Sequence, residues 1–88
     1  QIHDKSMSPR LFEGTKILID TSNIEPIEGN IYLFKFNTDI VLRNLIKELG
    51  TDNYIAQPEN IRFPSSLPFP KSEANILGKA IYKLGELL

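Results

Sequence analysis

The chain has 88 residues, 41% hydrophobic and 24% charged, which is typical of one small folded domain spanning residues 1–88. Its formal net charge is −1, with acidic and basic residues mixed along the chain, so it lacks the basic field that holds a nucleic-acid backbone. The absence of cysteine excludes disulfides and thiolate metal sites, and no apolar stretch has the roughly 20 residues of a membrane-spanning helix.

Glycine and proline divide the chain into segments with the length of β-strands. Residues 15–20 place Ile17 and Ile19 on one face and charged side chains on the other, a pattern that predicts a strand. Residues 30–37 contain three aromatic side chains at alternate positions, separated mainly by branched apolar residues. This composition is the clearest strand pattern in the sequence.

Two later segments have apolar residues at helical spacing, namely residues 38–50 and residues 76–88. Their periodicity alone predicts helices, although Gly78 and Gly85 each weaken a helix by roughly 1 kcal/mol relative to Ala. Between these segments, residues 58–70 contain four prolines, which remove backbone donors. We expect this stretch to be a long loop or an irregular edge.

A short motif near the start, Ser-Met-Ser-Pro at residues 6–9, precedes Gly14 and the strand that ends at Asp20. This order resembles the beginning of the S24 peptidase-like carboxy-terminal domain of LexA, UmuD and phage-type repressors. The similarity extends along nearly the whole chain: residues 26–34 look like that family's turn and next strand, residues 57–60 like its Pro-Glu-Asn turn, and residues 76–83 like its closing strand with a central Gly.

The resemblance implies an all-β, mainly antiparallel fold, the small twisted β domain that LexA shares with signal peptidases. It therefore predicts strands at residues 38–50 and 76–83, against their helical periodicity. In the family's repressors this domain forms dimers or higher oligomers, and a separate helix-turn-helix domain binds paired half-sites on operator DNA. Since the sequence starts at Gln1 without Met, we expect a longer cytoplasmic protein whose amino-terminal DNA-binding domain lies outside this chain.

The resemblance also implies a serine and lysine catalytic site. Ser6 matches the nucleophile, the backbone amides around Ser6 and Met7 are the candidate oxyanion donors, and the family's general-base lysine would stand at position 43. Position 43 is Arg43, and a guanidinium stays protonated and cannot accept the proton of the serine. Lys5, where the family usually has Asp, and Asp4, where Gly is common, are further departures. We therefore expect no peptidase activity.

Alternatives to this interpretation remain open. Ser6 precedes a proline-containing turn, where serine is usually a turn or capping residue. An active peptidase would need a lysine recruited from elsewhere; Lys35 and Lys47 are the nearest in sequence, and both fit solvated strand positions. A signal-peptidase-like enzyme is disfavoured, because nothing in the sequence indicates a membrane. His3 has no partner for a triad or a metal site, and we expect neither metal nor cofactor.

The closing segment is predicted to form a surface for self-association, because a domain this small cannot readily bury all of its apolar side chains alone. The predicted interface residues are Ile76, Leu77, Ile81, Leu84, Leu87 and Leu88. The sequence thus favours the homo-oligomeric regulatory domain of a transcriptional repressor over a self-cleaving peptidase.

Overall fold

Seven strands and one short 3-10 helix make up the regular structure within the described residues, which are 2, 4–8, 11, 14–83 and 86–88 of a computed structural model. Only the backbone of residues 86 and 87 is described. The elements in chain order are β1 (Ile17–Asp20), β2 (Ile31–Phe36), β3 (Asp39–Lys47), β4 (Asn53–Gln57), β5 (Phe69–Pro70), η1 (Lys71–Glu73), β6 (Ile76–Lys83) and β7 (Glu86–Leu87).

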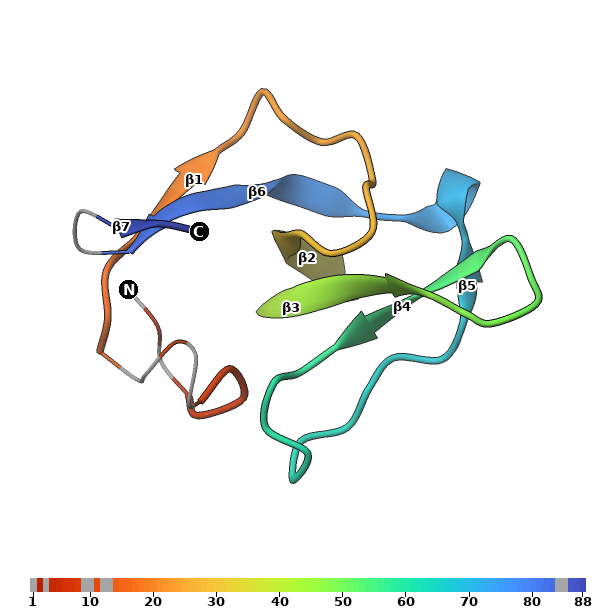
Figure 1. Ribbon diagram of the computed structural model, residues 1–88, viewed down its shortest axis with the longest axis horizontal. Coiled ribbons are helices and arrows are strands. Elements are labelled where there is room, and N and C mark those ends of the chain that lie inside the picture. The colour runs from red at the N-terminus through yellow and green to blue at the C-terminus, as the bar shows by residue number, and fades with distance from the viewer. Residues whose placement is uncertain (1, 3, 9–10, 12–13, 84–85) are drawn as a thin grey trace.

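The strands form one sheet in the order β1-β6-β2-β3-β4-β5, and β7 pairs with β6. Every pairing is antiparallel, which confirms the predicted all-β, mainly antiparallel fold. Figure 1 shows β1 and β6 on one side of the molecule, β4 and β5 on the other, and the amino-terminal segment beside the start of β3. No helix in the described ranges has the length and hydropathy to cross a membrane.

Two hydrophobic clusters cover opposite faces of the central strands. The Tyr32 cluster contains Tyr32, Phe34, Leu45, Ala56, Phe69 and Ile76. The Met7 cluster contains Ile2, Met7, Leu11, Ile31 and Ala80. The neighbours Ile31 and Tyr32 belong to different clusters because successive side chains of a strand point to opposite faces. The amino-terminal segment is thereby fixed to the sheet through its own apolar side chains.

Strand β3 shows why the helical periodicity of residues 38–50 was misleading. Arg43, Asn44 and Leu45 are buried in succession, since the sheet is covered on both faces at this point. Leu45 packs in the Tyr32 cluster, whereas Leu42 packs against the Met7 cluster. A strand covered on both faces has apolar residues at consecutive positions, a pattern that spacing alone does not distinguish from a helix.

Asn37 and Gly78 stand at positions where the turn and the close approach of two strands favour their residue types. Asn37, in the two-residue turn between β2 and β3, has a φ of 56°, and Asn is among the few residues that adopt this left-handed conformation readily. Gly78 lies where β6 passes closest to β1: a Cβ there would be 2.5 Å from Ile19 Cγ2 and 2.9 Å from the Asp20 carbonyl oxygen. A side chain at position 78 would push these strands apart.

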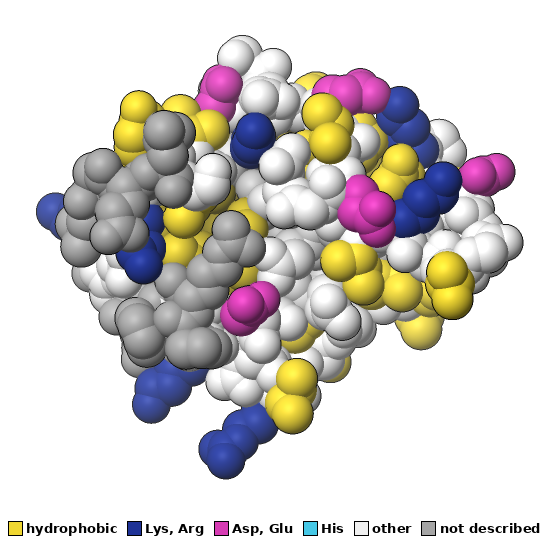
Figure 2. Space-filling view, viewed as in Figure 1, with side chains coloured by type: hydrophobic (Ala, Val, Ile, Leu, Met, Phe, Trp, Pro, Cys, Tyr) yellow, Lys and Arg dark blue, Asp and Glu magenta, His cyan; other side chains and the backbone are white. Residues whose placement is uncertain are grey.

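Charged side chains of both signs are interleaved on the surface. On the face shown in Figure 2, the hydrophobic side chains lie in several separate groups with Lys, Arg, Asp and Glu between them. This distribution agrees with the mixed charge of the sequence and its net charge of −1.

Candidate functional site

The loop that carries Ser6 is closed by the side chain of Asp4. The Oδ1 atom of Asp4 accepts hydrogen bonds from the Ser6 backbone N–H at 3.0 Å and from the Ser6 hydroxyl at 2.7 Å. An aspartate that binds the backbone amide two residues ahead forms an Asx-turn, which explains why the chain turns here. Ser6 itself is only 2% exposed.

Arg43 reaches Ser6 from strand β3. Its Nη1 donates to the Ser6 hydroxyl oxygen at 2.7 Å and to the Leu42 carbonyl oxygen at 2.8 Å. Arg43 is 8% exposed; burial lowers the pKa of its guanidinium, and the negative charge of Asp4 opposes that shift. Because arginine titrates so far above neutral pH, the guanidinium remains charged in this site.

These contacts determine what the Ser6 hydroxyl can do. Its proton is directed at Asp4, and its oxygen accepts a hydrogen bond from Arg43. A positive donor on the oxygen makes the oxygen a poorer nucleophile, and a carboxylate, with an ordinary pKa of about 3.9, is a weak base for a hydroxyl. The arrangement holds the loop together, and neither hydrogen-bond partner of the hydroxyl is an effective base for it.

A second segment holds the Ser6 loop from outside. The backbone N–H of Asn60 donates to the Ser6 carbonyl oxygen at 2.8 Å, and Asn60 Nδ2 donates to the Lys5 carbonyl oxygen at 3.2 Å. The preceding Glu59 accepts a hydrogen bond from Asn44 Nδ2 of β3 at 2.9 Å. The Pro-Glu-Asn turn therefore links β3 to the loop that carries the serine.

Of the two predicted oxyanion donors, one is already hydrogen-bonded. The Ser6 amide is already bound by Asp4. Within the described residues, the Met7 amide makes no hydrogen bond, while the Met7 carbonyl accepts one from the Leu11 amide at 2.8 Å. The side chain of Met7 is fully buried in the Met7 cluster. A single free amide gives a tetrahedral oxyanion less stabilisation than a pair of donors.

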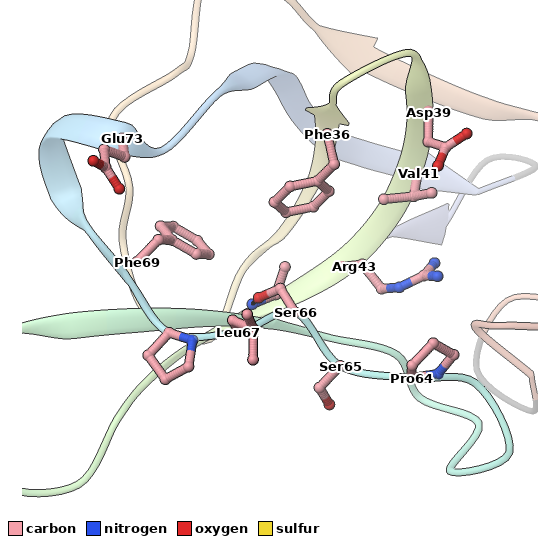
Figure 3. A pocket seen from close by; sticks show the side chains of 12 residues that line it. Phe36, Asp39, Val41, Arg43, Pro64, Ser65, Ser66, Leu67, Phe69 and Glu73 are labelled. Atoms are coloured by element: carbon pink, nitrogen blue, oxygen red, sulfur yellow. Dashed lines mark hydrogen bonds between the residues drawn. The ribbon is translucent and has the colours of Figure 1, made fainter.

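Two hollows lie next to this hydrogen-bonded group. The smaller one, about 170 Å³, has Asp4 and Ser6 in its wall. The larger one, about 510 Å³, has Arg43 in its wall and is drawn in Figure 3. The small hollow is also lined by Ile2, Met7, Leu33, Ile40, Val41 and Leu42.

The lysines named in the sequence analysis lie elsewhere. The side chains of Lys5, Lys35 and Lys47 are exposed. Among the hydrogen bonds that the structure describes, the Ser6 hydroxyl has Asp4 and Arg43 as partners and no lysine. His3 lies outside the described residues.

The closing segment is more buried than its composition indicated. Ile76 packs in the Tyr32 cluster and is only 8% exposed, so most of its side chain belongs to the core. Leu77 and Ile81 are half-buried, and Leu88 packs against the Met7 cluster. Leu84 lies outside the described residues, as does the side chain of Leu87. Self-association through this segment stays a prediction.

Asp4 is the site residue that sequence reasoning missed, since it was treated only as a departure from the family pattern. The sequence does contain a signal for its role, because Asp-x-Ser is the spacing of an Asx-turn. The same spacing recurs at Asp20 and Ser22, where Asp20 Oδ1 binds the Ser22 amide at 3.0 Å and its hydroxyl at 2.6 Å. The difference between the two turns is Arg43, which contacts only the first.

The sequence matches a known protein family over most of its length. Residues 1–81 match the model of the family described as Peptidase S24-like. No curated protein matches the sequence. The match covers nearly the whole chain, including the Ser6 loop, strand β3 and most of β6, and it confirms the resemblance stated from the sequence.

Proposed function

Because the chain belongs to the S24-like peptidase family, we propose that it is the regulatory, self-associating domain of a LexA-like or phage-type repressor and does not cleave peptides. The observation that carries this proposal is the 2.7 Å hydrogen bond from Arg43 Nη1 to Ser6 Oγ. A charged guanidinium occupies the place of the family's general base and cannot take the proton of the serine.

The site then acts as a structural link. Arg43 connects β3 to the Ser6 loop, and Asp4 balances part of its charge. Buried polar groups must be hydrogen-bonded, and this group is: no buried side-chain nitrogen or oxygen in the described residues lacks a partner. A peptidase site has been converted into a buried hydrogen-bonded connection.

In such a repressor, this domain would bring two copies of a separate DNA-binding domain together in the cytoplasm. A dimer places two recognition helices on paired half-sites, which neither copy reads alone with the same affinity. The net charge of −1 supports a repressor in which the separate DNA-binding domain, and not this domain, contacts the phosphate backbone.

Reaction of the chain with a fluorophosphonate probe, followed by mass spectrometry, tests this proposal. The unmodified chain is expected to remain unlabelled from pH 7 to pH 10, a range that approaches the ordinary pKa of lysine at about 10.4. Arg43→Lys places an amine on the same strand position, and labelling should appear at the alkaline end. Labelling of the unmodified chain that disappears in Ser6→Ala would favour the alternative, an active peptidase.

A double variant that also changes Asp4 makes the same experiment more discriminating. A nearby carboxylate raises the pKa of a lysine, so in Arg43→Lys alone the amine stays protonated to higher pH. Adding Asp4→Gly removes this charge and frees the Ser6 amide as a second oxyanion donor. The double variant should therefore label faster and at lower pH than the single variant, and adding Ser6→Ala should abolish its labelling.

A further inference from the structure

The segment of residues 59–68, which we call the strap, runs along the outside of the sheet with little packing of its own. It lies between two buried residues, Pro58 and Phe69, yet every residue within it is half-buried or exposed. Two of its apolar side chains, Ile61 and Leu67, are 96% and 86% exposed. A segment with so few buried apolar contacts opens at a smaller free energy than the whole domain needs to unfold.

Hydrogen bonds to the Ser6 loop and to β3 fasten the first end of the strap. The Asn60 amide donates to the Ser6 carbonyl oxygen at 2.8 Å. Glu59 accepts at 2.9 Å from Nδ2 of Asn44, which follows Arg43 along β3 and is only 9% exposed. This end of the strap is therefore bound both to the loop that carries Ser6 and to the strand position next to Arg43.

A serine fastens the other end of the strap to the outer edge of β4. The Ser66 amide donates to the Ala56 carbonyl oxygen at 3.0 Å, and the Ser66 hydroxyl accepts from the Ala56 amide at 2.9 Å. β5 covers the same edge at Asn53 and Tyr54. The strap thus occupies backbone groups of β4 that another strand could otherwise use, and its opening would expose them.

The strap also forms one wall of the cavity of about 510 Å³. Pro64, Ser65 and Leu67 lie on the strap, across from Val41 and Arg43 of β3, as Figure 3 shows. Arg43 is 8% exposed while this wall is in place. Opening of the strap would remove the wall and expose the side of β3 that carries Arg43.

We propose that the strap opens and closes as one unit and that its opening is coupled to the contact between Ser6 and Arg43. When the strap opens, the Ser6 loop keeps its hydrogen bonds to Asp4 and Arg43 but loses those to Asn60. Because coupling between two contacts is reciprocal, removal of the contact between Ser6 and Arg43 makes the strap easier to open. The strap is a gate over the edge of β4 and the cavity, and this role does not depend on the reactivity of Ser6.

Native-state hydrogen exchange of the 88-residue chain, followed by NMR, tests the proposal. The reporters are the amides of Asn60, Ser66 and Ala56, because their hydrogen bonds all break when the strap opens. The amide of the core residue Leu45, which donates to the Asn30 carbonyl oxygen at 2.9 Å, is the reference for global unfolding. The three strap amides should share one protection factor, at least about tenfold below that of the reference.

A matched pair of variants shows whether the strap opens as one unit. Glu59→Ala removes the hydrogen bond from Asn44 and should speed the exchange of all three strap amides about tenfold, including the two at the far end. Glu28→Ala is the control, because Glu28 also accepts a hydrogen bond from β3, at the Lys47 amide, but lies outside the strap. It should leave the three exchange rates unchanged.

A second pair of variants tests the coupling to the site. Ser6→Ala removes the contact with Arg43 and should speed the exchange of the strap amides about fivefold. Ser22→Ala removes the hydroxyl of the other Asx-turn and should not. The Leu45 amide reports any loss of stability of the whole domain, and such a loss does not by itself change the strap amides, which exchange through the smaller opening.

Four results would overturn the proposal. Equal protection of Asn60 and Leu45 would show that the strap opens only when the whole domain unfolds. A response to Glu59→Ala confined to Asn60, or an equal response to Glu28→Ala, would show that the strap does not open as a unit. Unchanged strap amides in Ser6→Ala would refute the coupling. The labelling of Ser6 by fluorophosphonate is measured separately, so failure here is distinguishable from failure of the proposed function.

Discussion

Ser6 and Arg43 show how far individual residues could be predicted. Their separation in sequence placed them at the positions of the family's nucleophile and general base, and in the structure Arg43 Nη1 lies 2.7 Å from Ser6 Oγ. The role of Asp4 was missed because this residue was compared only with the family's Gly. Its spacing to Ser6, which is that of an Asx-turn, was not considered. The burial of Arg43 also depends on both the Ser6 loop and β3, which pattern reasoning treats separately.

The contact between Ser6 and Arg43 should contribute to stability. A double-mutant cycle of Ser6→Ala and Arg43→Ala is expected to show a coupling free energy of about 1–3 kcal/mol, because a buried hydrogen bond to a charged group is lost. Urea unfolding measures it. Ser22→Ala is the control: it removes the hydroxyl hydrogen bond of the second Asx-turn, which is exposed, and should change the free energy of unfolding by less than about 0.5 kcal/mol. A coupling near zero would contradict a structural role for the pair.

The stability that Asp20 contributes is expected to depend on pH. Its pKa is lowered by hydrogen bonds from the Ser22 hydroxyl and amide, and to a smaller extent by the charge of Lys79. A lowered folded-state pKa contributes stability above the unfolded value of about 3.9 and loses it as pH falls through the folded value. An NMR titration of the Asp20 carboxyl should show the low midpoint. Ser22→Ala should raise that midpoint more than Lys79→Gln; the reverse order would show that charge, and not hydrogen bonding, dominates.

At the scale of elements, resemblance succeeded where periodicity failed. β3 is covered on both faces, so its apolar residues imitate helical spacing, and β6 buries every second residue from Ile76 to Ala80. Sequence spacing does not show how many faces of a strand are covered, since that depends on segments far away in the chain. The amino-terminal segment and the Tyr32 cluster supply the two covers.

Gly78 should be intolerant of any side chain. Gly78→Ala is expected to lower the free energy of unfolding by about 1–3 kcal/mol, because its Cβ would meet Ile19 Cγ2 and the Asp20 backbone, which cannot rotate away. Thermal and urea unfolding measure the loss. Lys79→Ala, on the next position of the same strand, is the control and should cost less. Equal losses would indicate a general sensitivity of β6 and not the close approach to β1.

At the scale of the whole molecule, exposed apolar residues gather where β1 pairs with β6. Leu18 and Tyr82 are cross-strand partners, and their exposed fractions are 55% and 39%. β1 is also the last strand on this side of the sheet, so its outer edge faces no other strand in the described ranges. Neither residue was among the predicted interface residues. Ile76, which was among them, lies in the core, and the sequence alone did not show this.

We expect the chain to self-associate through this region. Leu18→Ser with Tyr82→Ser should shift sedimentation towards the monomer at tens of micromolar, a range in which weak dimers still form. Leu49→Ser is the matched control: Leu49 is 98% exposed, but it lies beyond the end of β3 and should leave the equilibrium unchanged. A monomer in the unmodified chain would refute self-association, and an equal effect of both variants would refute this location.

The contact between Arg43 and Ser6 also bears on how such a site evolves. Lysine and arginine codons can differ by a single base, so under the proposed function one substitution at position 43 would separate a cleaving from a non-cleaving form of such a domain. The return step is nevertheless obstructed. A reverting lysine would lose the hydrogen bond to the Leu42 carbonyl and would meet an Asp4 that keeps its amine protonated. Because the guanidinium and Asp4 hold the loop together, we expect Arg43→Lys to lower stability even where it restores reactivity of Ser6.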